Sequence, residues 1–466
     1  MASSIAATVD RIKRDPSDVL DRARIHGVCE ELGHAWRERE LDPATTLALF
    51  LQQVLHGNCP CSEVRHLPGG DGRRGSFTGS AYCDARKRLP LAVCQAMLTE
   101  VIDAALPATR RDEHRWLGRH RVFHIDGSTF SMPDTAELRK AFGMPAGQAK
   151  GCGFPVAHLL VLFSAQTGLL LDAWAGPLRT GDVAQTPEAA GHLLPSDVLV
   201  GDDSFSSYAH LALLWRDKLH GLFPAHHKRI VSFRPRRRHT TEGKGAVAGM
   251  PRSRWVKHLG KDDQLVEYFK PKQKPAWISR GEYDALPDSI VVRELRRRVR
   301  GPAGNRVTLT IVTTLTDPDL YPADDLVALR LRRWDVETNI RHLKITMGMD
   351  VLRCRTEAGV RKRSRIRRLP GDELAVFCIA YNLVRVVMLQ AAARQEVPVA
   401  RVSFADALKW MRHARPGGTM PDLVVNPHRP GRAEPRCKKR RAKQFDLMNR
   451  PRHVLWKRLK TQRKNA

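Results

Sequence analysis

The chain has 466 residues, of which 42% are hydrophobic, so it is long enough for two or three domains with substantial cores and is not wholly disordered. Its formal net charge of +30 is far more than solubility requires and is typical of proteins that bind a phosphate backbone. An anionic membrane is the other suitable partner, but the sequence has neither a clear amphipathic basic helix nor a clear spanning segment. The most apolar run, residues 374–393, contains Asn382, Arg385 and Gln390, so we expect a buried helix there.

Two further features favour a cytosolic protein. The uncharged stretch at residues 1–9 is too short for a secretory signal, because a charged side chain already follows at Asp10. The nine cysteines are scattered, and Cys59 and Cys61 form their one cluster. Because no second ligand pair follows at zinc-finger spacing, we expect reduced thiols rather than a structural zinc site.

The N-terminal part is predicted to be helical. Residues 45–55 and 91–105 carry apolar side chains at helical spacing, and the glycine-rich residues 68–75 lie between them. We therefore expect a small helical domain over residues 1–115. The basic run at 86–88, Arg-Lys-Arg, is compatible with phosphate contacts and equally with a solvated helix face.

Two aspartates follow apolar, strand-like runs. Residues 122–126 end on Asp126 before a turn glycine, and residues 197–202 end on Asp202. The expected elements between them are two strands joined as a hairpin and then one helix: residues 154–165, 168–175 and 186–194. This order predicts a mixed α/β sheet. If the first and fourth strands are neighbours, the two carboxylates converge at one edge.

Residues 222–304 change to short alternating runs with dense charge, which predicts a β-rich insertion. Residues 264–269 and 289–295 are the strands expected within it, and residues 306–315 are expected to form the last strand of the sheet. Two tryptophans of the insertion are compatible with stacking on unpaired bases, although core packing is the commoner role: Trp255 and Trp277.

The segment 330–344 places charges on one side if it forms a helix. Spacings of three and four align four cations around one carboxylate: Arg330, Arg333, Glu337, Arg341 and Lys344. Such a stripe suits a site that holds a metal ion beside a polyanion, whereas most charged helix faces are solvated and carry ordinary ion pairs. The two aspartates at strand ends favour the first interpretation.

Asp126, Asp202 and Glu337 form a ligand set suited to hard cations. Two carboxylates at strand ends and one on a helix can hold two Mg²⁺ or Mn²⁺ ions about 4 Å apart. This arrangement activates a water or a 3′-hydroxyl and stabilises the leaving oxygen in phosphodiester chemistry. The order of the acids and the surrounding cations support the prediction, because acids alone are common in this chain.

These residues resemble the DDE transposases of bacterial insertion sequences, specifically insertion-sequence family four. The signature of that family is Tyr-x-x-Arg-x-x-x-Glu-x-x-x-x-x-x-Lys, and Arg333, Glu337 and Lys344 match its spacing. Asp126 lies in a family-like His-Ile-Asp-Gly-Ser, and Asp202 lies in Gly-Asp-x-x-Phe-Ser-Ser-Tyr. The resemblance implies a ribonuclease-H-like mixed sheet core with a β-rich insertion before the catalytic glutamate.

Three features depart from the family pattern. Arg330 stands where the signature has tyrosine, and Asp203 stands where the family often has arginine. Residues 363–372 intervene between Lys362 and Glu373, where family members tend to continue directly into a helix. We expect these ten residues to form a basic loop, which is either a tolerated insertion or the sign of a decayed copy.

Two other segments have weaker signals. The glycine-rich residues 143–153 match no phosphate-loop spacing and are expected to be a flexible loop. The tail, residues 428–466, has nine arginines and six lysines against two acids. We expect it to be a partly disordered extension that adds salt-dependent, sequence-independent affinity for DNA.

The resemblance implies a DNA transposase that binds the terminal inverted repeats of its own element. It would cleave at the element ends with metal-activated water and transfer the 3′-hydroxyl ends into target DNA. The implied ligands of two Mg²⁺ or Mn²⁺ ions are Asp126, Asp202 and Glu337. The residues expected to contact phosphates are Arg333 and Lys344, followed by Arg330 and Arg341.

The expected partner is double-stranded DNA, bound by a homodimer or a larger assembly because two element ends must be joined. The expected location is the bacterial cytoplasm, at the nucleoid. The expected N-terminal helical DNA-binding domain is residues 1–115. The two halves of the expected catalytic core are residues 116–221 and 305–395, with the β-rich insertion, residues 222–304, between them. A basic C-terminal region, residues 396–466, follows. The alternatives are a non-catalytic basic DNA-binding protein, such as a decayed transposase, and a metal-dependent structure-specific nuclease of the same fold.

Overall fold

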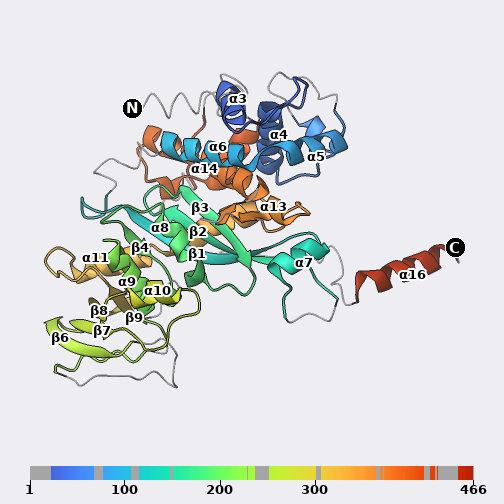
Figure 1. The fold of residues 1–466 in the computed structure, drawn as a ribbon. Coiled ribbons are helices and arrows are strands. Elements are labelled where there is room, and N and C mark those ends of the chain that lie inside the picture. The colour runs from blue at the N-terminus through green and yellow to red at the C-terminus, as the bar shows by residue number, and fades with distance from the viewer. Residues whose placement is uncertain are drawn as a thin grey trace.

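One nine-stranded mixed sheet forms the centre of the protein, with the strand order β3-β2-β1-β4-β5-β9-β8-β7-β6 (Figure 1). The computed structural model describes residues 22–67, 77–105, 115–146, 151–227, 229–236, 251–300, 306–363, 368–370, 372–413, 420–425, 428 and 450–464. Helices pack on both faces of the first strands of the sheet. The mixed α/β class expected from the sequence is therefore confirmed.

The strands of this sheet are β1 Val122–Ser131, β2 Val156–Ser164, β3 Leu170–Pro177, β4 Val198–Val200, β5 His220–Pro224, β6 Ser253–Gly260, β7 Asp263–Phe269, β8 Ser289–Arg300 and β9 Arg306–Thr313. β1, β2 and β3 pair antiparallel, whereas β4 is parallel to β1 and β5 is parallel to β4. β9 pairs antiparallel with β5 on one side and β8 on the other. The predicted hairpin is confirmed, and β9 is, as expected, the last strand of this sheet along the chain, although it lies in the interior of the sheet between β5 and β8.

The strands of the expected insertion extend the main sheet beyond β9 and do not form a sheet of their own (Figure 1). Two of them match the predicted strands, and the third, β6, carries no alternating apolar pattern in the sequence. β6 is an edge strand with mostly exposed side chains, so its residues need no apolar face. Hydrogen bonding to β7 alone defines it.

The N-terminal helices are α3 Arg22–Glu31, α4 Pro43–Leu55, α5 Gly79–Arg88 and α6 Leu91–Ala105. α4 begins at Pro43 because Asp42 caps it, accepting a hydrogen bond from Thr45 N over 2.7 Å. α4 and α6 pack on the long helix α14, Asp372–Arg394, which lies against β3 (Figure 1). The helices predicted at residues 45–55, 91–105 and 374–393 are confirmed.

A single hydrophobic cluster joins the N-terminal helices to the sheet. Phe50 of α4, Tyr381 of α14 and Val161 of β2 are all buried within it. Leu160 and Leu162, the neighbours of Val161 on β2, point to the opposite face of the sheet and pack there with α9, Tyr208–Arg216. Burial on both faces explains why β2 is a continuous apolar run.

α14 is, among the described helices, the one long and apolar enough to span a membrane. Within Glu373–Arg394, 89% of the most apolar stretch is buried inside the protein. Its polar residue Asn382 is also buried and exchanges two hydrogen bonds of 2.8 Å with the backbone of Leu170 on β3. These contacts are those of a core helix.

The ten extra residues before Glu373 were expected to form a loop, and that prediction is wrong. β10, Arg361–Arg363, and β11, Arg368–Pro370, pair antiparallel as a small hairpin that lies against β3. Of the ten residues, Arg363 and Arg368–Pro370 are thus paired in strands, and the last residue, Asp372, is the first of α14.

Glu373, at the start of α14, is fully buried and accepts several hydrogen bonds. The donors are Asn58 Nδ2 at 3.0 Å, Arg353 N at 2.9 Å and Cys354 N at 2.6 Å. This one carboxylate thus connects α14 both to the N-terminal region, at Asn58, and to the backbone at residues 353–354.

Other differences from expectation are local. The helix predicted over residues 186–194 ends early, as α8 Thr186–Ala190, with Gly191 at its C-cap position. α7, Ala136–Phe142, was not predicted. Residues 147–150 of the glycine-rich patch lie outside the described residues, as do most residues of the basic tail. The tail does contain the helix α16, Arg452–Lys464, which extends away from the body in Figure 1.

Candidate active site

Asp126 and Asp202 lie at the same level of two neighbouring parallel strands. In the β1–β4 pairing, His124 is opposite Val200, and each aspartate follows two residues later. Asp202 caps a short 3-10 helix, accepting hydrogen bonds from Ser204 N (2.9 Å) and Ser204 Oγ (2.6 Å). The expectation that the first and fourth strands are neighbours is confirmed.

The helix expected over residues 330–344 is not continuous, so the single charged stripe is wrong in detail. The segment consists of α11, Ala323–Leu331, then α12, Trp334–Arg341, and then a π-helical turn, His342–Thr346. At the junction Arg333 N donates to Arg330 O (3.2 Å) and Val336 N donates to Arg333 O (2.9 Å), the pattern of a tight 3-10 turn. The helix is wound more tightly before Glu337 and more loosely after Arg341. The charged side chains of this segment therefore do not lie on one continuous face.

Arg333 joins the carboxylate on β1 to the carboxylate on α12. Its Nη1 donates to Asp126 Oδ2 over 2.9 Å, and its Nη2 donates to Glu337 Oε1 over 2.7 Å. Asp126 and Arg333 are each 13% exposed, whereas Glu337 is 43% exposed. The structure therefore brings an acid on β1 and the helical acid of the sequence pattern to one guanidinium. The expectation that the strand ends on Asp126 before a turn glycine is wrong, because β1 continues through Gly127 to Ser131, paired with β2.

The environment of Asp126 favours its neutral form. Burial raises the pKa of Asp126 to about 6, and the carboxylates of Asp202 and Asp182 add to that rise. The ion pair with Arg333 and the hydrogen bond from Gly127 N lower the pKa, but burial outweighs both. This carboxylate has less countercharge around it than its ionised form requires.

Arg330 lies among the same acids although it departs from the family pattern. Burial, with repulsion by Arg333, lowers the pKa of the Arg330 guanidinium to about 10, while Asp202 and Asp126 attract it. Lys344 reaches β1, donating from Nζ to Ser128 Oγ over 3.1 Å. Arg341, by contrast, is exposed on α12.

Sequence reasoning missed Asp182, which no motif or strand end marks. Its Oδ1 lies 2.5 Å from His158 Nε2, and Gln185 Nε2 lies 2.6 Å from the other ring nitrogen of this histidine. A Cβ atom on Gly127 would lie 2.1 Å from Asp182 Oδ1, so the glycine after Asp126 is required by close packing. Asp182 is thus a fourth acid beside Asp126.

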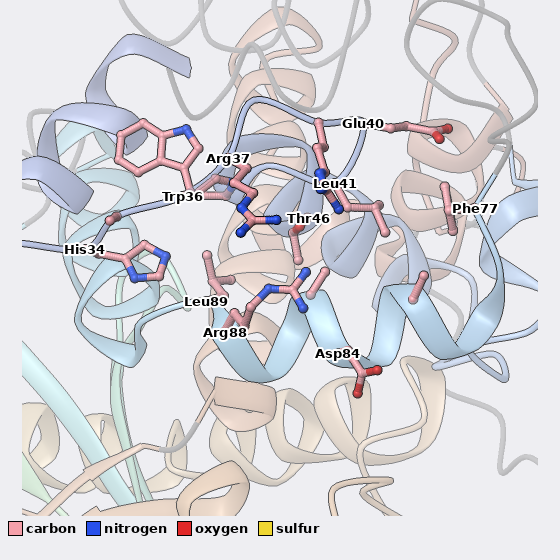
Figure 2. Close-up of a pocket in the computed structure, with 15 residues that line it drawn as sticks. His34, Trp36, Arg37, Glu40, Leu41, Thr46, Phe77, Asp84, Arg88 and Leu89 are labelled. Carbon is pink, nitrogen blue, oxygen red and sulfur yellow. The ribbon is translucent and has the colours of Figure 1, made fainter.

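A separate hollow of about 800 Å³ lies between residues 34–46 and α5. Figure 2 shows Arg37 and Arg88 directed into the same space, with Trp36 at one end and Phe77 at the other. None of the three acids of the sequence pattern lines it.

The basic run on α5 is divided between the interior and the surface. The Arg86 guanidinium lies 3.5 Å from the centroid of the Phe50 ring and donates to Gln53 Oε1 over 3.1 Å, so its assignment as a phosphate contact is wrong. Lys87 is exposed and forms an ion pair with Asp84 at 2.9 Å. Arg88, in the hollow of Figure 2, is the member that a ligand there would meet.

Comparison with known proteins gives the family of the chain. The family described as "Transposase DDE domain" matches residues 117–369, which contain all three acids of the pattern. The chain is also 26% identical over 416 residues to "Transposase InsG for insertion sequence element IS4" of Escherichia coli (strain K12), and this match covers 85% of the chain and 83% of that relative. The chain belongs to the DDE transposases, and within them to the IS4 family.

Proposed function

We propose that this transposase binds the terminal inverted repeats of its insertion sequence, cleaves at the element ends and transfers the 3′-hydroxyl ends into target DNA. The observation that carries the proposal is the convergence of Asp126, Asp202 and Glu337, held partly by Arg333, beside the carboxyl end of β4. The net charge of +30 suits a DNA substrate and predicts strongly salt-dependent binding.

We further propose that the core is ribonuclease-H-like. The order β3-β2-β1-β4-β5, with three antiparallel strands followed by two strands parallel to β1, supports this assignment. The parts proposed from the sequence, with residues 1–115 as a DNA-binding region and residues 222–304 as an insertion, remain our description of its organisation. The hollow in Figure 2, with two guanidinium groups beside aromatic rings, is compatible with DNA contact by the N-terminal part.

Asp126, Asp202 and Glu337 fit a pair of Mg²⁺ or Mn²⁺ ions. All three offer carboxylate oxygens, which hard cations prefer, and Asp126 is a largely buried carboxylate beside the further acids Asp202 and Asp182, a place where a cation would be stabilised. When bound, such ions activate the attacking hydroxyl and stabilise the charge on the leaving oxygen.

The remaining residues of the site act through their own charge and hydrogen bonds. Arg333 donates a hydrogen bond to Asp126 and to Glu337, so its single charge offsets part of their negative charge and it sets their separation. In our proposal Arg333 and Lys344 also position phosphates, Arg330 contributes a third positive charge near Asp202, and Arg341 contacts DNA from the exposed side of α12. Because two element ends must meet, we propose that a homodimer or larger assembly acts on DNA, at the nucleoid in the bacterial cytoplasm.

The test incubates the full chain with labelled element-end DNA, target DNA and Mg²⁺. We expect cleavage and joining by the parent protein and by Asp324→Ala, a control acid on α11 whose side chain is 96% exposed. Asp126→Ala, Asp202→Ala and Glu337→Gln should each abolish both reactions while retaining DNA binding.

The outcomes separate the alternatives. Cleavage that persists in all three variants would overturn the assignment of the acids. Cleavage by the parent protein without joining would identify a nuclease. Binding of element ends by the parent protein without any cleavage would identify a decayed, non-catalytic copy.

A further inference from the structure

Three metal-binding side chains gather next to the proposed catalytic acids but are separate from them. They are Asp203, His226 and His227, and their ligand atoms all lie within 4.8 Å of one another. Asp203 Oδ2 is 3.0 Å from His227 Nδ1, and the rings of His226 and His227 stack with centroids 4.3 Å apart. The two histidines follow β5, and Asp203 follows the neighbouring strand β4.

The fold explains why these residues meet. β4 and β5 are parallel neighbours, so the segments that leave their carboxyl ends lie at the same edge of the sheet. The backbone of His227 adds a further tie, because its N–H donates to Asp203 Oδ2 over 3.2 Å. The contact is therefore anchored on both sides by strands.

The chemistry of the cluster differs from that of an ordinary aspartate–histidine ion pair. An ordinary ion pair joins one carboxylate and one imidazole, whereas here a ligand atom of a second imidazole also lies within 4.8 Å of the other two ligand atoms. Bonds of about 2.0–2.1 Å at tetrahedral angles place neighbouring ligand atoms about 3.4 Å apart, so the cluster needs only small side-chain movements to close on one ion. Two imidazoles and one carboxylate suit Zn²⁺ and similar transition ions rather than Mg²⁺.

We propose that Asp203, His226 and His227 bind one transition-metal ion of the Zn²⁺ type, with solvent completing its coordination. This ion would be distinct from the proposed Mg²⁺ ions, and it would join the short helix that begins beside Asp202 to the segment after β5. The side chain of His227 is 68% exposed, so the site is open to an ion from solution. Asp203 supplies the negative charge of the site.

The test uses the full chain without an affinity tag and Co²⁺ as a spectroscopic substitute for Zn²⁺. We expect one equivalent of Co²⁺ to give visible ligand-field absorption, which Zn²⁺ displaces and millimolar Mg²⁺ does not. His226→Ala/His227→Ala and, separately, Asp203→Asn should weaken Co²⁺ binding at least tenfold. The matched control is His258→Ala, which removes an exposed histidine on β6 and should leave the titration unchanged.

A second set of variants locates the ion. Asp126→Asn/Glu337→Gln removes two of the proposed Mg²⁺ ligands and should retain Co²⁺ binding. Equal Co²⁺ binding by the parent and the double histidine variant would overturn the proposal, as would the absence of bound Co²⁺ in the parent. Loss of binding in Asp126→Asn/Glu337→Gln alone would place the ion among the catalytic acids, which overturns this site and leaves the proposed transposition chemistry intact.

Discussion

Arg333 donates a hydrogen bond to Asp126 over 2.9 Å, although 207 residues separate the two in the sequence. The same guanidinium also holds Glu337, so one side chain sets the separation between an acid on the sheet and an acid on a helix. Arg333 is 13% exposed, which makes this contact less subject to solvent screening than a surface ion pair.

Arg333→Ala should reduce the single-turnover rate of end cleavage by about 100-fold or more, the usual cost of removing a preorganised donor from an active site. Arg333→Lys should restore only part of the rate, because one ammonium group cannot reproduce the fork that contacts both carboxylates. Arg216→Ala is the control, since this exposed arginine on α9 pairs with Asp217 away from the site. Equal losses in Arg333→Ala and Arg216→Ala would contradict the role given to Arg333.

Asp126 should make stability depend on pH in metal-free protein. Burial raises its folded pKa to about 6 from an ordinary value of 3.8, so its contribution to stability is full below about pH 4 and is lost as the pH rises through 6. Two pKa units correspond to at most about 3 kcal/mol. Asp126→Asn should therefore gain stability relative to the parent protein between pH 4.5 and pH 8, measured by urea unfolding in EDTA.

The test is how the difference in unfolding free energy between Asp126→Asn and the parent changes with pH. Its absolute value is less informative, because Asp126→Asn also removes the charged partner of Arg333 and so adds a constant to the difference. Asp324→Asn, at an exposed position, should show no such change with pH. A difference between Asp126→Asn and the parent that is the same at both pH values would refute the assigned pKa.

Gly127→Ala should destabilise the protein by about 1–3 kcal/mol, because the new methyl group would lie 2.1 Å from Asp182 Oδ1 and force that side chain away from His158. It should also slow cleavage, since Gly127 directly follows Asp126. Thermal unfolding and the cleavage assay measure the two effects. In Gly127→Ala/Asp182→Ala the two losses of stability should be clearly less than additive, and strict additivity would show that the two residues do not clash.

Glu373→Ala should cost about 3 kcal/mol of unfolding free energy, because it leaves the buried amide of Asn58 and two part-buried backbone N–H groups without their acceptor. Glu63→Ala, an exposed acid in the same N-terminal region, should change stability by less than about 0.5 kcal/mol. Urea titrations of both variants are sufficient. A small effect of Glu373→Ala would mean that the hairpin β10–β11 and not this carboxylate positions the start of α14.

The sequence predicted the strands that carry Asp126 and precede Asp202 because both begin as apolar runs, but only Asp202 follows a strand end, since β1 continues past Asp126 to Ser131. It also predicted α14, since its apolar side chains continue around the whole helix. The break at Arg333 was not predictable from periodicity, because a 3-10 turn followed by a π-helical turn keeps the residue spacing while changing the faces.

The other misses arise from contacts between distant segments. Asp182 is adjacent to Asp126 only because β1 and β2 pair and the loop after β3 folds back over them. Arg86 resembles a surface cation in sequence, but the ring of Phe50 on α4 lies beneath its guanidinium. β6 lacks an apolar pattern because hydrogen bonds to β7, rather than burial, hold it in the sheet.

The shared core of the N-terminal helices and α14 has a consequence for synthesis of the chain. α4 and α6 leave the ribosome first, but the helix that covers their apolar side chains, including Phe50 and Met97, begins only at Asp372. A nascent chain must therefore carry uncovered apolar surface until all nine strands of the sheet have been made. A chain interrupted anywhere before Asp372 cannot complete the cluster that joins the N-terminal helices to the sheet, so the earliest part to be synthesised is among the last to become stable.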